Sequence, residues 1–245
     1  MRSLTSDDRE TFLKALRVIY STTDLASGQK LYGPRFRTGE TFTKKHLWEM
    51  TLEGCTPFHD GPVFFTAHAA FDMEMEQALQ SIDASIALPY WDYTIDHKKY
   101  GIDWMTESPM WGDEWFGSLS TTNEDRIVDS GRFAYTPVQQ DSSAPEHNSF
   151  GMVTEVHNND PVTFVTRGNE VCGYKAKGPL PGCTELKGAL VGADTMHELQ
   201  AAVEYDFHAI LHSQVSLNFL PSSSHRLLTL HAFDSARRPI FGPRL

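Results

Sequence analysis

The chain has 245 residues, 40% of them hydrophobic, which is enough to bury the core of one ordinary domain. Its formal net charge is −11 and its basic residues are scattered, so neither a nucleic acid nor an anionic membrane is expected as a partner. No apolar run is long enough to span a bilayer, and the first residues are too polar for a secretory signal. We expect a soluble protein, in a compartment that the sequence leaves open. A single domain over residues 1–245 is expected because no linker or repeat divides the chain.

The first third of the chain has the apolar spacing of helices. Residues 6–20 begin with acidic side chains and then repeat apolar residues every three or four positions. Residues 41–52 form a second expected helix, which carries His46. A third is expected to open at the Asp-Gly-Pro of residues 60–62 and to run to about Ile82, with His68 in its first turns.

The middle of the chain has a different composition. Residues 93–192 are rich in glycine, proline, asparagine and aspartate, so we expect mostly loops there, with small strands at 151–156 and 163–166. A capping box then starts a helix over 195–215, and 226–233 is a further helical or extended candidate. The predicted fold class is mainly α, a helical bundle with long irregular loops and a few short strands.

Two pairs of histidines stand out by their spacing. His208 and His212 are four apart in an expected helix, so their rings lie on one face and can reach one metal ion. His59 and His68 flank the start of another helix, where the chain can fold back to a common point. Any one of these histidines taken singly is more simply a core or surface residue.

The combination of the two pairs indicates metal binding. Neutral imidazole suits copper, zinc, iron or nickel, and copper(II) is bound most tightly among the divalent ions. Structural zinc sites normally use thiolates, and neither pair has a cysteine partner of that kind. Two centres facing each other across a helical bundle would form a binuclear site.

One segment resembles a known family. The run HDGPVFFTAH at 59–68, then Glu76 and LPYWDY at 88–93, resembles the first copper site of the tyrosinase family over roughly fifty residues. The resemblance identifies His59 and His68 as the second and third ligands of that site. His46, upstream in an expected helix, takes the place of the first ligand.

The second half of such a site is matched more briefly. The segment from Val203 through His208 to His212 resembles the start of the family's second copper site. The resemblance implies two copper ions, with dioxygen and a small phenol as substrates, and a tyrosinase or catechol oxidase activity that yields o-quinones. The implied ligand set is His46, His59, His68, His208, His212 and His231.

The chain departs from the family pattern after the second pair. The usual Gly-Gly pair and the Asp-Pro-x-Phe-x-x-His-His signature are missing, so His231 is the best candidate for the sixth ligand and His225 is the alternative. Ala209 stands where the family often has an asparagine linked to the phenol proton, and Ala69 replaces a common arginine. The first of these changes favours catechol oxidation over monophenol hydroxylation.

Two other classes of function therefore stay open beside the oxidase. One is a dioxygen carrier of the haemocyanin kind, which shares the site but shields it from substrates. The other is a degenerate, non-catalytic relative in which the second copper half is incomplete after residue 215.

The remaining candidates are cysteines, carboxylates and single histidines. Cys172 and Cys183 are close enough in sequence to pair, and the family resemblance allows a thioether between Cys55 and His59. Glu76, Asp92 and Glu204 are candidates for orienting the imidazoles, or are simply structural. No ligand role is expected for the four other histidines. His197 lies in the last expected helix, and the remaining three are expected in surface loops: His97, His147 and His157.

Overall fold

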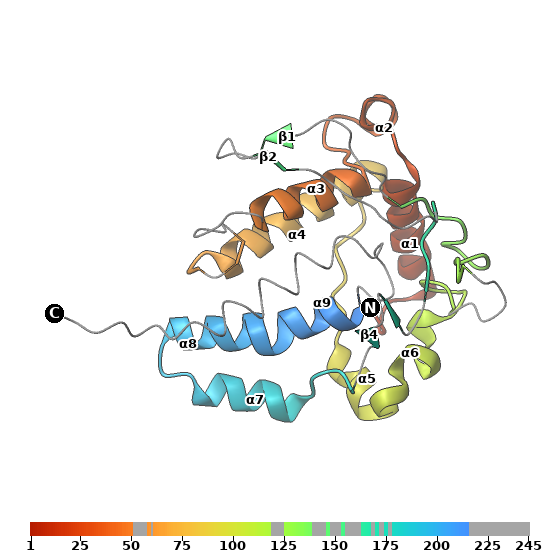
Figure 1. Ribbon diagram of the computed structural model, residues 1–245. Helices are drawn as coiled ribbons and strands as arrows, with labels where there is room; N and C mark the ends of the chain where they lie inside the picture. Colours follow the sequence, from red (N-terminus) through yellow and green to blue (C-terminus); the bar gives the residue numbers. More distant parts are fainter. Residues whose placement is uncertain are drawn as a thin grey trace.

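A computed structural model describes residues 1–50, 58–59, 61–118, 125–138, 146–147, 153–154, 163–167, 170–171, 174–175 and 178–215. The structure is mainly helical, as predicted (Figure 1). The α-helices are α1 (Ser6–Ser21), α2 (Leu25–Tyr32), α3 (Gly39–Met50), α4 (Phe64–Ile82), α5 (Tyr93–Tyr100), α6 (Trp104–Glu107), α7 (Cys183–Gly192), α8 (Met196–Ala201) and α9 (Ala209–Val215). None of these helices is long and apolar enough to cross a membrane.

The helices form two groups that face each other (Figure 1). Helices α3 and α4 lie side by side and are joined by the edge contact of Phe42 with Phe71 and by the ion pair of Lys45 with Glu74. Helix α1 packs against both of them. The opposite group is the continuous helix from Met196 to Val215, with α7 against its outer side.

Helix α1 has the bounds expected from its sequence. The side chain of its N-cap, Thr5, accepts a hydrogen bond from the backbone N–H of Asp8, and two aspartates occupy the first turn. The predicted apolar stripe is buried and forms part of one core cluster together with residues of α3 and α4.

Helix α4 begins later than predicted. Its first residue is Phe64, and its N-cap, Val63, makes no capping hydrogen bond through its side chain. Asp60, the expected capping residue, lies outside the described residues. Pro62 precedes the helix instead of occupying its first turn, because residues 61–63 form a turn in which the Phe64 N–H donates to the Gly61 carbonyl.

The prediction of loops over 93–192 is wrong at both ends. Helix α5 follows immediately after the LPYWD segment, and 3-10 turns at Gly101–Asp103 and Pro109–Trp111 flank α6. Helix α7 occupies the other end. The side chains of α5 are mostly polar and give no apolar period, so its helix depends on a cap: Asp92 Oδ1 accepts from the Thr94 N–H at 3.1 Å.

Short strands do occur in the middle of the chain. β1 (Glu146–His147) pairs antiparallel with β2 (Val153–Thr154), which lies inside the predicted strand at 151–156. β3 (Glu170–Val171) pairs with β4 (Tyr174–Lys175). The predicted strand at 163–166 is reduced to isolated bridges, one of which joins Thr166 to Ile127.

The long helix over 196–215 starts as predicted. Thr195 Oγ1 accepts from the Glu198 N–H at 3.2 Å, and Glu198 Oε2 accepts from the Thr195 N–H at 2.9 Å, a reciprocal capping box. The sequence does not predict that residues Ala202–His208 are π-helical, with the Ala209 N–H bonded to the Glu204 carbonyl five residues back.

The LPYWD segment is held to α4 by side chains of that helix. Glu76 Oε2 accepts from the Leu88 N–H at 2.8 Å, and Gln80 Nε2 donates to the Ile86 carbonyl at 2.9 Å. Glu76, a candidate for orienting the imidazoles, therefore serves the backbone of a neighbouring segment. Asp92, another such candidate, is the cap of α5.

A buried carboxylate fixes the next turn of the chain. Asp96 is 0% exposed and accepts from Trp91 Nε1 at 2.8 Å. The guanidinium of Arg2 pairs with the same carboxylate and donates to Ser108 Oγ at 2.9 Å. Because a buried charge is costly unless paired, this network ties the first residues of the chain to α5 and to the segment before the second 3-10 turn.

The bond between Glu76 and Leu88 yields a stability prediction. Glu76→Ala leaves a half-buried backbone N–H without its acceptor, so we expect the free energy of unfolding of the metal-free protein to fall by about 1–3 kcal/mol in urea titrations. Glu76→Gln keeps an acceptor oxygen and should lose less. The exposed Met73 of the same helix gives the control, Met73→Ala. Equal losses in the alanine and glutamine variants would contradict this role.

The capping box yields a pH prediction. Hydrogen bonds from the backbone of Asp194 and Thr195 lower the pKa of Glu198 below its ordinary value. A lowered pKa in the folded state means stabilisation that is present above the unfolded pKa, about 4.3, and is lost as the pH falls through the folded value. Glu198→Gln should therefore lower Tm at pH 7, and its difference from the wild type should shrink toward pH 3.

The matched control is Glu107→Gln, an exposed glutamate of α6 outside this cap. A Tm difference for Glu198→Gln that is the same at pH 7 and pH 3 would show that the carboxylate charge is not what stabilises the start of α8.

Candidate metal centre

Three predicted ligands of the first copper site lie together. His46 projects from α3, His59 precedes α4 and His68 lies in the second turn of α4; one nitrogen from each ring can be chosen so that all three lie within 4.8 Å of one another. Within the described part of the chain, this is the group of histidine, cysteine or acidic side chains that could hold a metal ion. The three residues that the sequence analysis assigns to one metal site, His46, His59 and His68, thus form a cluster in the structure.

His68 has its two ring nitrogens in different roles. Nδ1 donates to the carbonyl of Phe64 at 2.9 Å, which leaves Nε2 as the nitrogen with a free lone pair. That Nε2 is buried, and no hydrogen-bond partner reaches it from the described residues. In metal-binding histidines, one ring nitrogen typically donates to a carbonyl or carboxylate, which fixes the tautomer and leaves the other nitrogen for the metal. The bond from Nδ1 to Phe64 gives His68 this arrangement.

The same burial affects the charge of His68. Desolvation lowers the pKa of its imidazole, against the opposing effects of the Phe64 carbonyl and of the Asp72 carboxylate. A neutral ring is favoured, and only a neutral imidazole can bind a metal ion.

Aromatic side chains surround the histidines. Phe58 lies 5.9 Å from His46 and 5.5 Å from His68 between ring centroids, and Phe64 lies 4.6 Å from His68. Phe71, from the next turn of α4, closes the group at 5.9 Å from His46. These rings exclude water from one side of the cluster.

His208 reaches the same cluster from the opposite helix. Its Nε2 lies 3.4 Å from Nε2 of His59, and its ring centroid lies 4.7 Å from that of His68. Phe64 contacts it as well, with centroids 5.2 Å apart. The two halves that the sequence predicts separately are therefore in direct contact through imidazoles.

The other predicted ligands of the second half are only partly described. His212 lies in α9, one turn beyond His208, and the placement of its side chain is not described. His231, its alternative His225 and the candidate piece at 226–233 lie outside the described residues. Their ligand roles stay predictions.

A carboxylate that the sequence analysis passed over lies beside the cluster. Asp72 is exposed, one helical turn after His68, and the two interact electrostatically. Desolvation by the neighbouring groups raises the pKa of this Asp72 carboxyl above its ordinary value, and the interaction with His68 opposes the rise. Its four-residue spacing from His68 was the signal that could have identified it.

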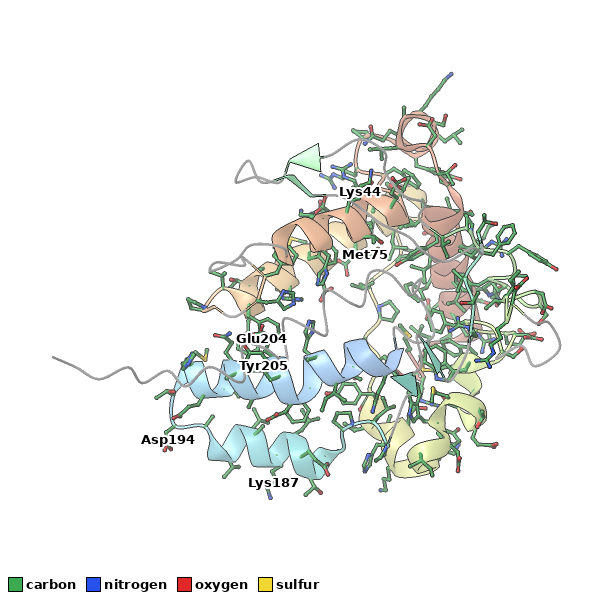
Figure 2. All side chains as sticks on the ribbon, in the orientation of Figure 1. Lys44, Met75, Lys187, Asp194, Glu204 and Tyr205 are labelled. Carbon is green, nitrogen blue, oxygen red and sulfur yellow. The ribbon has the colours of Figure 1, made fainter. Side chains whose placement is uncertain are left out.

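A buried polar pair lies one turn before His208. Glu204 is 3% exposed and its Oε2 accepts from Nε2 of the buried Gln200 at 2.8 Å. Figure 2 shows Glu204 on the side of the long helix that faces α4, whereas Lys187 points away from that helix on α7. Of the three carboxylates proposed to orient the imidazoles, Glu204 is the one on the helix that carries His208.

The other histidines differ in position. His97 does not lie in a surface loop as predicted: it is in α5, half-buried, and its Nδ1 contacts the carbonyl of Leu180 ahead of α7. His197 is exposed on α8, and His147 lies in β1. His157 lies outside the described residues.

The predicted covalent links remain predictions. Cys183 is exposed at the start of α7, but its predicted partner Cys172 lies outside the described residues. Cys55, the candidate for a thioether to His59, lies outside them as well.

The donor set fits a metal ion of borderline softness. All of the converging atoms are imidazole nitrogens, one of them a buried Nε2 with no partner in the described part of the chain. Burying such an atom costs free energy unless it is satisfied, and a metal ion would satisfy it.

Comparison with known proteins agrees with this geometry. The family described as the common central domain of tyrosinase matches residues 36–241. A tyrosinase of Streptomyces antibioticus is 30% identical over 132 residues, which cover 54% of this chain and 41% of the relative. The tyrosinase of Streptomyces lincolnensis is 30% identical over 136 residues, or 56% and 43% of the two chains.

A third relative has a different name. Grixazone synthase of Streptomyces griseus is 36% identical over 76 residues, 31% of this chain and 22% of the relative. The matched part thus spans less than half the length of each of these relatives. The family match extends over most of the present chain and includes every histidine predicted as a ligand, so the chain belongs to the tyrosinase family.

Proposed function

We propose that this chain is an oxidase of phenols or catechols that works with a pair of copper ions. The tyrosinase family is copper-dependent, and the chain would act as one domain over residues 1–245. One ion would be held by the α3–α4 group and the other by the long helix with a residue near the end of the chain. The proposed ligands are His46, His59 and His68 for the first ion, and His208, His212 and His231 for the second.

The observation that carries this proposal is the meeting of imidazoles from both halves. His46, His59 and His68 cluster on one side, and His208 reaches them from the other. A single cluster would support only a mononuclear centre. An imidazole from the long helix that faces the first cluster supports a binuclear centre in a helical bundle, for which His212 and His231 are the proposed further ligands.

The protein's own groups would position and protect the metal pair. The Phe64 carbonyl fixes the orientation of His68, the rings of Phe58 and Phe64 pack against His68, and Phe71 packs against His46. On the opposite helix, the Gln200–Glu204 hydrogen bond holds the turn before His208. These contacts would hold the ring of His68 and the turn before His208 in place when copper binds.

The chemistry proposed is the oxidation of a catechol by dioxygen. Bound copper supplies the redox chemistry for this reaction. Two catechols each lose two electrons and two protons to become o-quinones, and one dioxygen takes up the four electrons and four protons as two waters. Ala209, in the position where the family often has asparagine, favours the catechol over the monophenol as substrate.

Copper content and turnover test the proposal together. We expect the copper-loaded protein to bind two copper ions per chain, by elemental analysis, and to consume dioxygen when a catechol is added. His68→Ala and His208→Ala should each lower catechol turnover by more than about 100-fold, since loss of a ligand exceeds the cost of losing an outer partner. His197→Ala, at an exposed histidine of α8, is the matched control.

The contrary outcomes point to the other function classes. Two copper ions with reversible dioxygen uptake and no catechol oxidation would replace the oxidase with a carrier. One copper ion or none, with no oxidation of a catechol, would indicate a non-catalytic relative.

Substitution at position 209 tests the preference for catechols. Ala209 is half-buried and directly follows His208. Ala209→Asn adds an amide where a phenol proton could be handled, so we expect the ratio of monophenol to catechol turnover to rise by about 10-fold, within the range of general acid–base effects. Ala209→Leu adds similar bulk without an amide and is the control. An equal change in both variants would assign the effect to size alone.

A further inference from the structure

The segment that leads into α7 is tied to two other helices. The Leu180 carbonyl accepts a hydrogen bond from Nδ1 of His97 in α5, and the Pro179 carbonyl accepts one from Nε2 of Gln214 at 3.3 Å, in the last turn of α9. Figure 1 shows α7 starting beside α5 and the end of α9. Residues 179–182, the strap, therefore join α5 to the end of α9.

The strap is anchored in the core and lies against the ring of His97. Leu180 is 1% exposed and belongs to the core cluster, and Gly182 is buried as well. A Cβ at Gly182 would lie 2.8 Å from both Cδ2 and Nε2 of His97, which is too close for two side chains. The φ of Gly182 is −103°, so the close approach of the ring, and not the backbone conformation, requires glycine here.

The end of α9 carries the proposed ligand His212. Residues 208 and 212 are four apart and share one face of the long helix, and His208 on this face reaches His59 of the first cluster. Residue 214 lies about 200° around the helix axis from residue 212, at about 100° per residue. The buried Gln214 therefore holds the strap on the side of α9 that is opposite to the ligand face.

From these contacts we propose that His97 is a positioning residue of the second metal half. Through the strap it fixes the last turn of α9, and with it the backbone at His212. This role rests on the proposed function, in which His212 binds the second ion. The first ion depends on α3, on α4 and on the turn before α4, which carry its three proposed ligands.

Loss of the ring at His97 would free the strap on two sides. The carbonyl of the buried Leu180 would lose the donor that holds it, and space would open beside Gly182. The strap could then shift together with the carbonyl that Gln214 binds. The second ion should therefore be affected and the first should not.

The test is copper binding, measured without turnover. Copper(I) is loaded in the absence of oxygen, and competition with a chromophoric chelator gives the affinity for each ion; His68→Ala, which removes a ligand of the first ion, identifies the second. We expect His97→Ala to weaken the second ion by about 10-fold and the first by less than about 2-fold, since outer partners of metal ligands typically contribute 10–100-fold.

Two further variants define the role of the imidazole. His97→Asn keeps an N–H donor near the position of Nδ1 and should recover most of the affinity for the second ion. His197→Ala, at an exposed histidine of α8, is the matched control and should leave both ions unchanged. Equal weakening of both ions in His97→Ala would overturn the proposal, because a general loss of stability has that effect.

Gly182→Ala tests the contact between the strap and the ring. The added methyl group needs space that the His97 ring occupies, so we expect the same selective weakening of the second ion. In a His97→Ala background only the flexible end of Glu185 is in the way, and the substitution should add little. Effects that add up in the double variant would contradict this contact.

Hydrogen exchange of the metal-free protein gives a result that does not depend on copper. In His97→Ala we expect faster exchange of the backbone amides of α9, with those of α4 unchanged. Unchanged exchange in α9 would overturn the positioning role. A wild type that binds fewer than two copper ions contradicts the proposed function instead, and the exchange of α9 then decides whether His97 holds the end of this helix.

Discussion

The buried Nε2 of His68 is the constraint on which the site depends. A nitrogen lone pair that is removed from water without a donor costs about 1–3 kcal/mol, so the surrounding structure must hold it there. The hydrogen bond from Nδ1 to Phe64 holds the ring, and the aromatic walls keep water away. A metal ion would recover the cost, which couples metal binding to the stability of the fold.

The rest of the fold can be understood as support for that ring. Helix α4 carries His68 and is held on one side by α1 and on the other by the segment that follows it, through Glu76 and Gln80. The next turn is fixed by the buried carboxylate of Asp96. The LPYWD segment is thus held by backbone and core contacts. Its acidic residue, Asp92, caps α5, and none of its described hydrogen bonds is made to a histidine.

Sequence patterns predicted the helices with apolar periods and failed where tertiary contacts decide. Helix α1 and the long helix followed from spacing and caps, whereas α5 was missed because its polar side chains give no period. His97 was assigned to the surface, although a chain segment more than 80 residues away covers it. The cluster of residues 46, 59 and 68 was predictable from the family motif. Its contact with His208 was not, because no local pattern encodes the distance between two helices.

The π-helical stretch before His208 adds a constraint of its own. A π turn takes more residues than the 3.6 of an α-helix, so residues after Ala202–His208 are rotated relative to those before it. The buried Gln200–Glu204 bond spans the entry to this stretch and fixes where the rotation begins. The direction of His208 is therefore set jointly by the capped start of α8, by this bond and by the π turn. A regular α-helix over the same residues would carry His208 around the helix axis, away from His59, and separate the two halves of the site.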